Sequence, residues 1–199
     1  RLTGKRRVGF NEGEAFKWPA DRQKIVNHIM FHTNDVAEHD LYWTTSIYEY
    51  PIRREDYAMD EHALWADLDA VDPSTLDDYP PTIAWESSPG RYQALWLAAQ
   101  GDFQGASWPG NENQRMTYMI GADPSGWDTV QLLRVPHTPN HKPEYRGDNG
   151  EYPEGKLLWY NGPRYSPGDF SELPPVVVGE TQVTDALSSD IDGVDRLEV

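Results

Sequence analysis

The sequence predicts an α+β fold built on a largely antiparallel or mixed sheet packed with helices. Strand-like and helix-like segments are intermixed along the chain, and two of the strand-like segments flank a strong hairpin turn. The 199 residues, of which 38% are hydrophobic, include eight Trp and eleven Tyr, which is enough apolar bulk for a core. We therefore expect one domain, or one domain with an appended subdomain.

The first part of the chain predicts a helix followed by a strand. Asp21 can cap a helix over residues 22–33, in which apolar residues recur at helical spacing. His28 and His32 lie one turn apart on it, a spacing that zinc sites can use, although ordinary helix packing explains them better. Residues 41–48 are rich in aromatic and β-favouring side chains and predict a strand.

The middle of the chain predicts a strand and then a hairpin. Residues 63–69 form an apolar run that ends in acidic residues. Residues 82–86 and 91–97 then flank Ser87-Ser-Pro-Gly90, and a Pro-Gly pair between two strand-like segments is a strong turn signal.

The last part predicts two helices and a final strand. Residues 111–121 have the pattern of a short helix, and Asp128 is placed to cap a second helix over 129–134. Prolines end this second helix, and a loop rich in Gly and Pro leads to a strand at 156–160.

Composition limits the classes of partner. The net charge of −16 argues against bulk, non-specific attraction to nucleic acid. Part of that charge lies in an acidic stretch at 176–199, which we expect to be a tail or linker after a catalytic domain at 1–175. Cysteine is absent, which excludes disulfides and thiolate metal sites, and no apolar run is long enough to predict a membrane span.

Two acids, Asp67 and Asp69, stand one residue apart at the end of the 63–69 run. Strand geometry places them on one face with Trp65, roughly 6–7 Å apart at Cα. Two anions this close repel each other, so the pair is best tolerated with a cation between them. Carboxylate oxygens favour Mg²⁺ or Mn²⁺, which keep open positions for substrate phosphates.

The order of three segments then resembles a known family. The acidic strand is followed by Ser88-Pro-Gly-Arg-Tyr-Gln93 and then by Gly121-Ala-Asp123 with Leu132-Leu-Arg-Val-Pro-His-Thr-Pro-Asn-His-Lys142. This order resembles the archaeo-eukaryotic primase superfamily, and most closely the primase-polymerase domains of phage and plasmid replication proteins. The resemblance spans about residues 36–175 and implies an RRM-like catalytic sheet, about 61–175, beside an N-terminal α/β layer, about 1–60.

The resemblance also implies the catalytic acids. Asp67 and Asp69 match the family's first motif, two metal-binding acids on a strand, and Asp123 matches its third motif, a further acid that closes the metal site. Asp128 is an alternative third ligand, although its position also suits a helix cap. Three carboxylates are enough to hold the two Mg²⁺ or Mn²⁺ ions that nucleotidyl transfer uses.

Further residues are expected to bind the nucleotide or the template. The family places such contacts at Arg134, Asn140 and Lys142, and Gln93 stands where its second motif usually has His. Arg91 shares a strand face with Gln93 and could hold phosphate oxygens through two parallel hydrogen bonds. The turn containing Ser88 and Gly90 can present backbone N–H groups to an anion.

The expected activity is attack of a 3′-hydroxyl on the α-phosphate of a dNTP or NTP, templated by single-stranded DNA. The resemblance implies a phage- or plasmid-encoded cytoplasmic enzyme of a bacterial host, with no membrane partner, and a helicase in the same full-length polypeptide is common in the family. Two alternatives remain open. One is a metal-dependent glycosyltransferase, which also uses Asp-x-Asp, and the other is a non-catalytic module that binds single-stranded nucleic acid.

Overall fold

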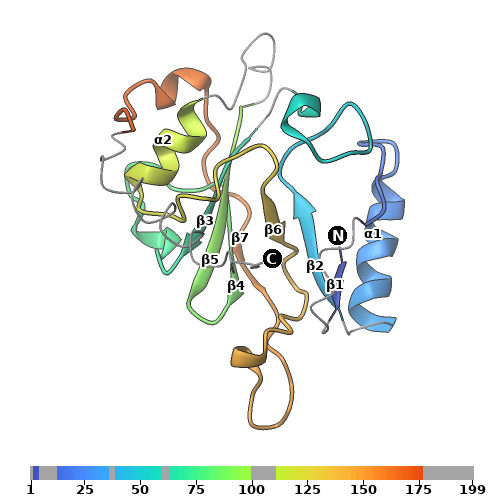
Figure 1. The fold of residues 1–199 in the computed structure, drawn as a ribbon. Coiled ribbons are helices and arrows are strands. Elements are labelled where there is room, and N and C mark those ends of the chain that lie inside the picture. The colour runs from blue at the N-terminus through green and yellow to red at the C-terminus, as the bar shows by residue number, and fades with distance from the viewer. Residues whose placement is uncertain (1, 5–12, 36–38, 60–62, 100–110, 177–199) are drawn as a thin grey trace, which may run out of the picture.

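The computed structural model describes residues 2–4, 13–35, 39–59, 63–99 and 111–176. The predicted acidic tail lies outside these residues from position 177 onward. The chain forms two antiparallel sheets side by side, with a helix on the outer side of each (Figure 1). This arrangement is the α+β architecture that the sequence predicts.

The smaller sheet has three strands in the order β1-β2-β6. Its strands are β1 (Leu2–Gly4), β2 (His39–Thr44) and β6 (Leu132–Arg134), and α1 (Arg22–Met30) lies beside it (Figure 1). The predicted helix over 22–33 is confirmed as α1, which continues into a π-helical turn at Phe31–Asp35. Because β6 comes from late in the sequence, the N-terminal layer is completed by a strand far beyond residue 60.

The larger sheet has four strands in the order β3-β5-β4-β7. They are β3 (Ala63–Asp69), β4 (Ile83–Ser88), β5 (Arg91–Leu97) and β7 (Lys156–Trp159), and α2 (Asn111–Met119) contacts β3. The hairpin and the strands at 63–69 and 156–160 are confirmed. Short 3₁₀ helices stand at Glu55–Tyr57, Pro73–Thr75, Pro143–Tyr145 and Pro167–Phe170.

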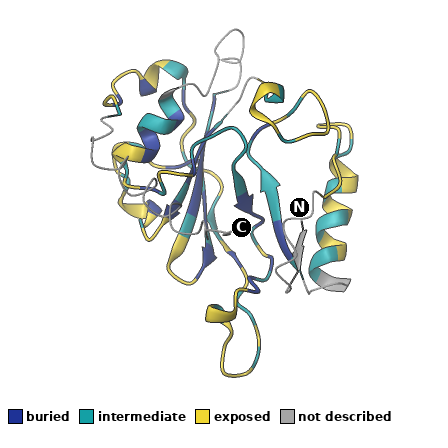
Figure 2. Cartoon of the chain, in the orientation of Figure 1, coloured by how far each residue is buried: buried dark blue, intermediate teal, exposed yellow. Residues whose placement is uncertain are grey.

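The larger sheet is buried on both faces, so β3, β5 and β4 carry most of the buried residues in Figure 2. Leu64 and Trp96 on one face pack with Met116 of α2. Trp65 and Trp85 on the other face pack with Leu133 of β6. This second core fixes the smaller sheet against the larger one and leaves space for a site where its apolar residues end.

The open edge of β3 is satisfied by side chain and loop groups, since an unpaired strand edge exposes backbone donors and acceptors. The Asn113 side chain, fully buried on α2, accepts a hydrogen bond from the Trp65 amide at 2.9 Å. Further along the same edge, the Asp123 amide donates to the Asp67 carbonyl at 2.9 Å. The loop after α2 is thereby tied to the acidic end of β3.

One predicted element is wrong. Residues 129–134 are not a helix: Asp128 begins a turn, and residues 132–134 form β6. β6 pairs with β2 in the register Tyr42↔Arg134. This partner lies some 90 residues earlier in the chain, so its pairing overrides the local helical pattern.

Within the described residues, no helix has both the length and the apolar character needed to cross a bilayer.

Candidate active site

A cavity of about 310 Å³ lies where the two sheets meet. Its walls come from β2, β3, the β4–β5 hairpin, β6 and the loop that follows β6. Most of the residues predicted for the site line it, namely Asp67, Asp69, Ser88, Arg91, Gln93, Arg134, Asn140 and Lys142. Gly90, Asp123 and Asp128 do not line it. Segments that are distant in sequence therefore meet in one polar hollow.

Asp67 is the most perturbed acid in the cavity. It is half-buried on the face of β3 that carries Trp65, and the Gln93 amide donates a hydrogen bond to its carboxylate. Burial and the negative charges of Asp69 and Asp123 together raise the pKa of Asp67 to about 6, although the Gln93 hydrogen bond opposes them. A carboxylate that is costly to ionise alone is one that a cation would stabilise.

Asp69 reaches the same cavity by a different backbone path from the one predicted. A β-bulge lies between Asp67 and Asp69, and Asp69 has a φ of 51°, in the left-handed region. The simple alternation that would align both acids is therefore broken, although both still line the cavity. The exposed Asp69 carboxylate pairs with Arg91 at 3.4 Å.

The backbone of Asp123 lies beside that of Asp67, and the Asp123 carboxylate contacts Ser125. Its Oδ1 accepts hydrogen bonds from the Ser125 amide at 2.9 Å and the Ser125 hydroxyl at 2.8 Å. Its charge is nevertheless close enough to raise the pKa of Asp67. Asp128 accepts a hydrogen bond from the Val130 amide at 3.0 Å within a turn, so it does not cap the helix expected after it.

In the described part of the chain, no three His, Cys, Asp or Glu side chains form a group that could enclose a metal ion. Asp67, Asp69 and Asp123 therefore do not form such a group in the structure, and the Oδ1 of Asp123 is engaged by Ser125. Asp67 and Asp69 still fit a divalent ion. Mg²⁺ is usually bound by one or two carboxylates together with substrate phosphates and water, rather than by an all-protein cage.

Arg134 lines the cavity, yet its guanidinium is engaged within the protein. It is 2% exposed and pairs with Asp40 at 3.0 Å. It also donates to the Tyr42 hydroxyl at 2.7 Å and to the Asn140 side chain at 3.1 Å, and it lies over the Tyr42 ring. This ties β2, β6 and the following loop together, so contact of Arg134 with a nucleotide remains only a prediction.

Asp40 and Asn140 complete this buried network. The Asp40 carboxylate accepts from Arg134 and from the His141 amide at 2.8 Å. Burial would raise the pKa of Asp40, but the hydrogen bonds and positive charge of Arg134, with the His141 contact, hold it below its ordinary value. The Asn140 oxygen accepts from Arg134 and from the Lys142 amide, so Asn140 shapes the loop that carries Lys142.

Arg91 and Lys142 are the exposed cations of the cavity. Arg91 is on the hairpin and is half-exposed beside Asp69. Lys142 is exposed, and across the described ranges its side chain forms no ion pair with an acid. The buried Ser88 lies with them, whereas the Gly90 amide donates to the Glu86 carboxylate at 2.7 Å and is unavailable to an anion.

Several cavity residues were not predicted from the sequence. Tyr42, Ser87, Leu132, Glu144 and Tyr145 line it, and Asp40 and His141 support it from behind. No local signal marks Tyr42 or Asp40, because their role depends on the pairing of β2 with β6. Glu144 and Tyr145 lie directly after Lys142, so extending the last motif by three residues would have found them.

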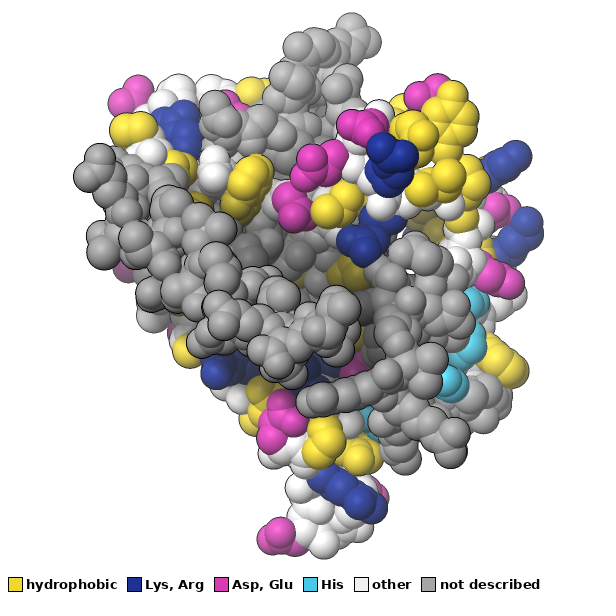
Figure 3. All heavy atoms as spheres, viewed as in Figure 1, with side chains coloured by type: hydrophobic (Ala, Val, Ile, Leu, Met, Phe, Trp, Pro, Cys, Tyr) yellow, Lys and Arg dark blue, Asp and Glu magenta, His cyan; other side chains and the backbone are white. Residues whose placement is uncertain are grey.

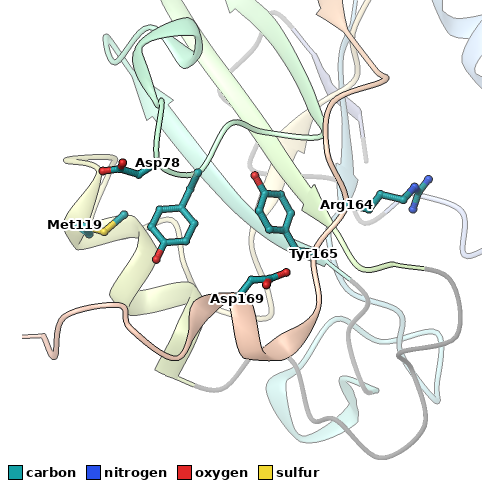
Figure 4. A pocket seen from close by; sticks show the side chains of 6 residues that line it. Asp78, Met119, Arg164, Tyr165 and Asp169 are labelled. Atoms are coloured by element: carbon teal, nitrogen blue, oxygen red, sulfur yellow. The ribbon is translucent and has the colours of Figure 1, made fainter.

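Two other features do not make a comparable site. A larger hollow of about 710 Å³ is lined by Tyr79, Arg164, Tyr165 and Asp169 among others (Figure 4). Three of its polar side chains are engaged within the protein: the Tyr165 hydroxyl donates to the Pro80 carbonyl, Arg164 donates to the Ala98 carbonyl, and Asp169 accepts from the Ser166 amide. His side chains gather on the α1 flank of the molecule (Figure 3), where the His28 and His32 rings pack 4.4 Å apart between centroids.

Comparison with known proteins decides the family. Residues 47–167 match the family model described as the RepB DNA-primase N-terminal domain. The chain belongs to this family. The matched segment contains every residue predicted for the site, from Asp67 to Lys142.

The chain is also similar to one curated protein and to solved structures. A DNA primase of Acidithiobacillus ferrooxidans is 32% identical over 85 residues, which are 41% of this chain and 23% of that protein. The chain thus spans about a quarter of the length of that curated relative. The primase-polymerase domain of cyanophage S-2L has the same fold, with a TM-score of 0.54, 13% identity, and coverage of 88% of this chain and 87% of that one. The catalytic domain of primase Repb′, solved with initiator DNA, aligns with a TM-score of 0.48 at 19% identity, over 76% of this chain and 72% of that one.

These findings confirm the predicted resemblance to primases and the predicted fold. They also remove the glycosyltransferase alternative. The roles of individual residues, the metal ions and the setting of the reaction remain predictions.

Proposed function

We propose that this RepB primase domain catalyses template-directed nucleotidyl transfer on single-stranded DNA, as a primase or polymerase in phage or plasmid replication. The 3′-hydroxyl of the growing strand would attack the α-phosphate of a bound dNTP or NTP and release pyrophosphate. The observation that carries the proposal is the cavity between the sheets, which has Asp67 and Asp69 and the two exposed cations, Arg91 and Lys142, around one polar space.

The two acids suit the binding of a divalent cation. Asp67 is half-buried, Asp69 is exposed, and both open onto the same cavity. A bound Mg²⁺ or Mn²⁺ pair would neutralise charge on the α-phosphate and the leaving pyrophosphate. Asp67 and Asp69 would hold these ions, and Asp123 would contribute its negative charge beside Asp67 and serve as the third ligand if its contacts with Ser125 are exchanged.

The two cations suit the triphosphate. Arg91 is paired with Asp69 at 3.4 Å while both side chains are about half exposed, which is a weak and exchangeable contact. On nucleotide binding, Arg91 would exchange this carboxylate for phosphate oxygens, which leaves Asp69 available to the cation. Lys142, held in place by the Asn140 contact to its amide, would approach the same phosphates from the opposite wall.

The proposed surroundings follow from the same assignment. The template would be single-stranded DNA, and a helicase domain elsewhere in the full-length polypeptide would supply it. The reaction would take place in the cytoplasm of a bacterial host.

The test is templated incorporation of dNMP or NMP by the purified chain with Mn²⁺ or Mg²⁺. The double variant Asp67→Ala/Asp69→Ala should lose at least about 100-fold in rate, because both proposed ligands are removed. Asp77→Ala/Asp78→Ala is the control, since it also removes two nearby acids, both exposed, and neither lines the cavity. Wild-type activity in the Asp67/Asp69 double variant would overturn the assignment of the site.

The same assay separates the remaining alternative. A non-catalytic binding module would bind labelled single-stranded DNA equally well with and without Mn²⁺ plus dNTP, and the wild-type chain would incorporate no nucleotide. Incorporation that depends on both metal and template excludes that alternative.

A further inference from the structure

Gln93 lines the cavity, and its buried side chain contacts groups that can only donate hydrogen bonds. It is 5% exposed on β5, at the centre of the wall that faces β6. Its Oε1 accepts hydrogen bonds from the Trp85 indole N–H at 3.1 Å and from the Arg134 backbone N–H at 2.9 Å. Neither of these groups can accept a hydrogen bond, so the oxygen of the side-chain amide must face them.

The orientation of the amide therefore determines what its NH₂ group can do. With the oxygen fixed by Trp85 and Arg134, the nitrogen points the other way, where it donates to the Asp67 carboxylate. Asp67 and Gln93 are also cross-strand partners in the β3–β5 ladder, which keeps the two side chains adjacent. One side chain thus links β4, β6 and the acid at the end of β3.

We infer that Gln93 is a positioning residue that holds the Asp67 carboxylate for a divalent cation, rather than a residue that contacts the nucleotide phosphates. The inference rests on the function proposed above. It changes the role expected for Gln93 from phosphate binding to orientation of an acid.

The chemistry of a carboxamide suits this role. A neutral N–H donor fixes one carboxylate oxygen and leaves the carboxylate its full negative charge for a cation. A cationic donor at the same place would form an ion pair with Asp67 and compete with the metal. Because Gln does not titrate, its hydrogen bond to Asp67 is present at every pH at which Asp67 is ionised.

The test measures binding of Mn²⁺ alone to the nucleotide-free protein, by electron paramagnetic resonance of free Mn²⁺ or by calorimetry. Gln93→Leu should weaken Mn²⁺ binding about 10- to 100-fold, the usual effect of removing a hydrogen bond to a metal ligand. The KM for dNTP at saturating Mn²⁺ should change less than about threefold. Gln93→His, which can accept through one ring nitrogen and donate through the other, should recover most of the Mn²⁺ affinity.

Three further variants keep the experiment decisive. Gln23→Leu, at an exposed position on α1, is the matched control and should bind Mn²⁺ as the wild type does. If Gln93→Leu fails to fold because two buried donors lose their acceptor, Trp85→Phe/Gln93→Leu removes one of those donors, with Trp85→Phe alone as its control.

The outcomes distinguish this inference from the proposed function. Weaker Mn²⁺ binding in both Asp67→Asn and Gln93→Leu supports both. Weaker binding in Asp67→Asn alone, with an increased KM for dNTP in Gln93→Leu, overturns the inference and returns Gln93 to the phosphates. Unchanged Mn²⁺ binding in both variants contradicts the proposed metal site itself.

Discussion

Replacing Asp67 by Asn should make the metal-free protein more stable while removing its activity. The carboxylate of Asp67 is half-buried and surrounded by the charges of Asp69 and Asp123, which together raise its pKa from 3.8 to about 6. At ~1.4 kcal/mol per pKa unit, this difference corresponds to a destabilisation of up to ~3 kcal/mol when the group is ionised in the folded state. Asn keeps the shape and an oxygen that can accept from Gln93, but it carries no charge.

The sign of the pH dependence follows from the direction of the pKa change. In the folded wild type Asp67 binds its proton more tightly than in the unfolded chain, so the penalty is complete above about pH 6 and decreases as the pH falls toward 3.8. The stability gained by Asp67→Asn should therefore be largest at pH 8 and should nearly vanish at pH 4.

Urea denaturation in EDTA at pH 8 and pH 4 measures this effect. Adding Mn²⁺ should stabilise the wild type and not the variant, because only the native wild type would bind the ion. Asp77→Asn is the control, as an exposed acid that does not line the cavity. An Asp67→Asn variant that is equally or less stable than the wild type at pH 8 without metal would refute this account of the site.

Three further predictions follow from the same site. Arg91→Ala should raise the KM for dNTP about 10- to 100-fold, because it removes hydrogen bonds to the charged phosphates. The stability should change little, since the Arg91 side chain is half-exposed, and an unchanged KM in steady-state assays would exclude Arg91 from the phosphates. Asp40→Ala should destabilise the fold by about 3–5 kcal/mol in urea denaturation, since it leaves the buried Arg134 charge unpaired, and a loss below ~1 kcal/mol would contradict that role. The stabilisation from Asp40 itself is present above its ordinary pKa of 3.8 and should be lost as the pH falls through its lowered folded value. Lys142→Ala should weaken dNTP binding and reduce its salt dependence, and identical salt slopes for variant and wild type would place Lys142 outside the phosphate contacts.

The elements with a strong local signal could be predicted from the sequence. The alternation in 63–69, the Pro-Gly turn and the aromatic strands defined the larger sheet and its hairpin. The order of the motifs brought Asp67, Arg91, Gln93 and Lys142 into one expected site, and the structure gathers them around one cavity. Motifs of this kind can be recognised in a sequence because each residue is placed by the strand or turn immediately around it.

What could not be predicted depends on contacts between distant segments. The strand β6 was expected as a helix because nothing within 129–134 indicates that β2 is its partner. Arg134 was expected to face a ligand, whereas Asp40, 94 residues away, binds its guanidinium. A sequence pattern can identify a charged residue beside a cavity, but it does not show which of its donors are already occupied.

The local path of the chain at Asp69 was also beyond the sequence pattern. Strict alternation assumes one residue on each strand opposite one on its neighbour, and a bulge adds a residue to one side only. The bulge and the left-handed conformation of Asp69 change the direction of its side chain while keeping it at the cavity.

The interleaving of the two sheets has a consequence for how this protein can be made. On the ribosome, β2 emerges almost ninety residues before β6, so at ~5–20 residues per second it waits for roughly 4–18 seconds without that neighbour. During this interval its edge is open to pairing with other nascent strands. For the same reason, dividing the chain near residue 60 would put β2 on one fragment and β6 on the other. Each fragment would then lack the strand that its own strand pairs with, so neither would complete the smaller sheet alone.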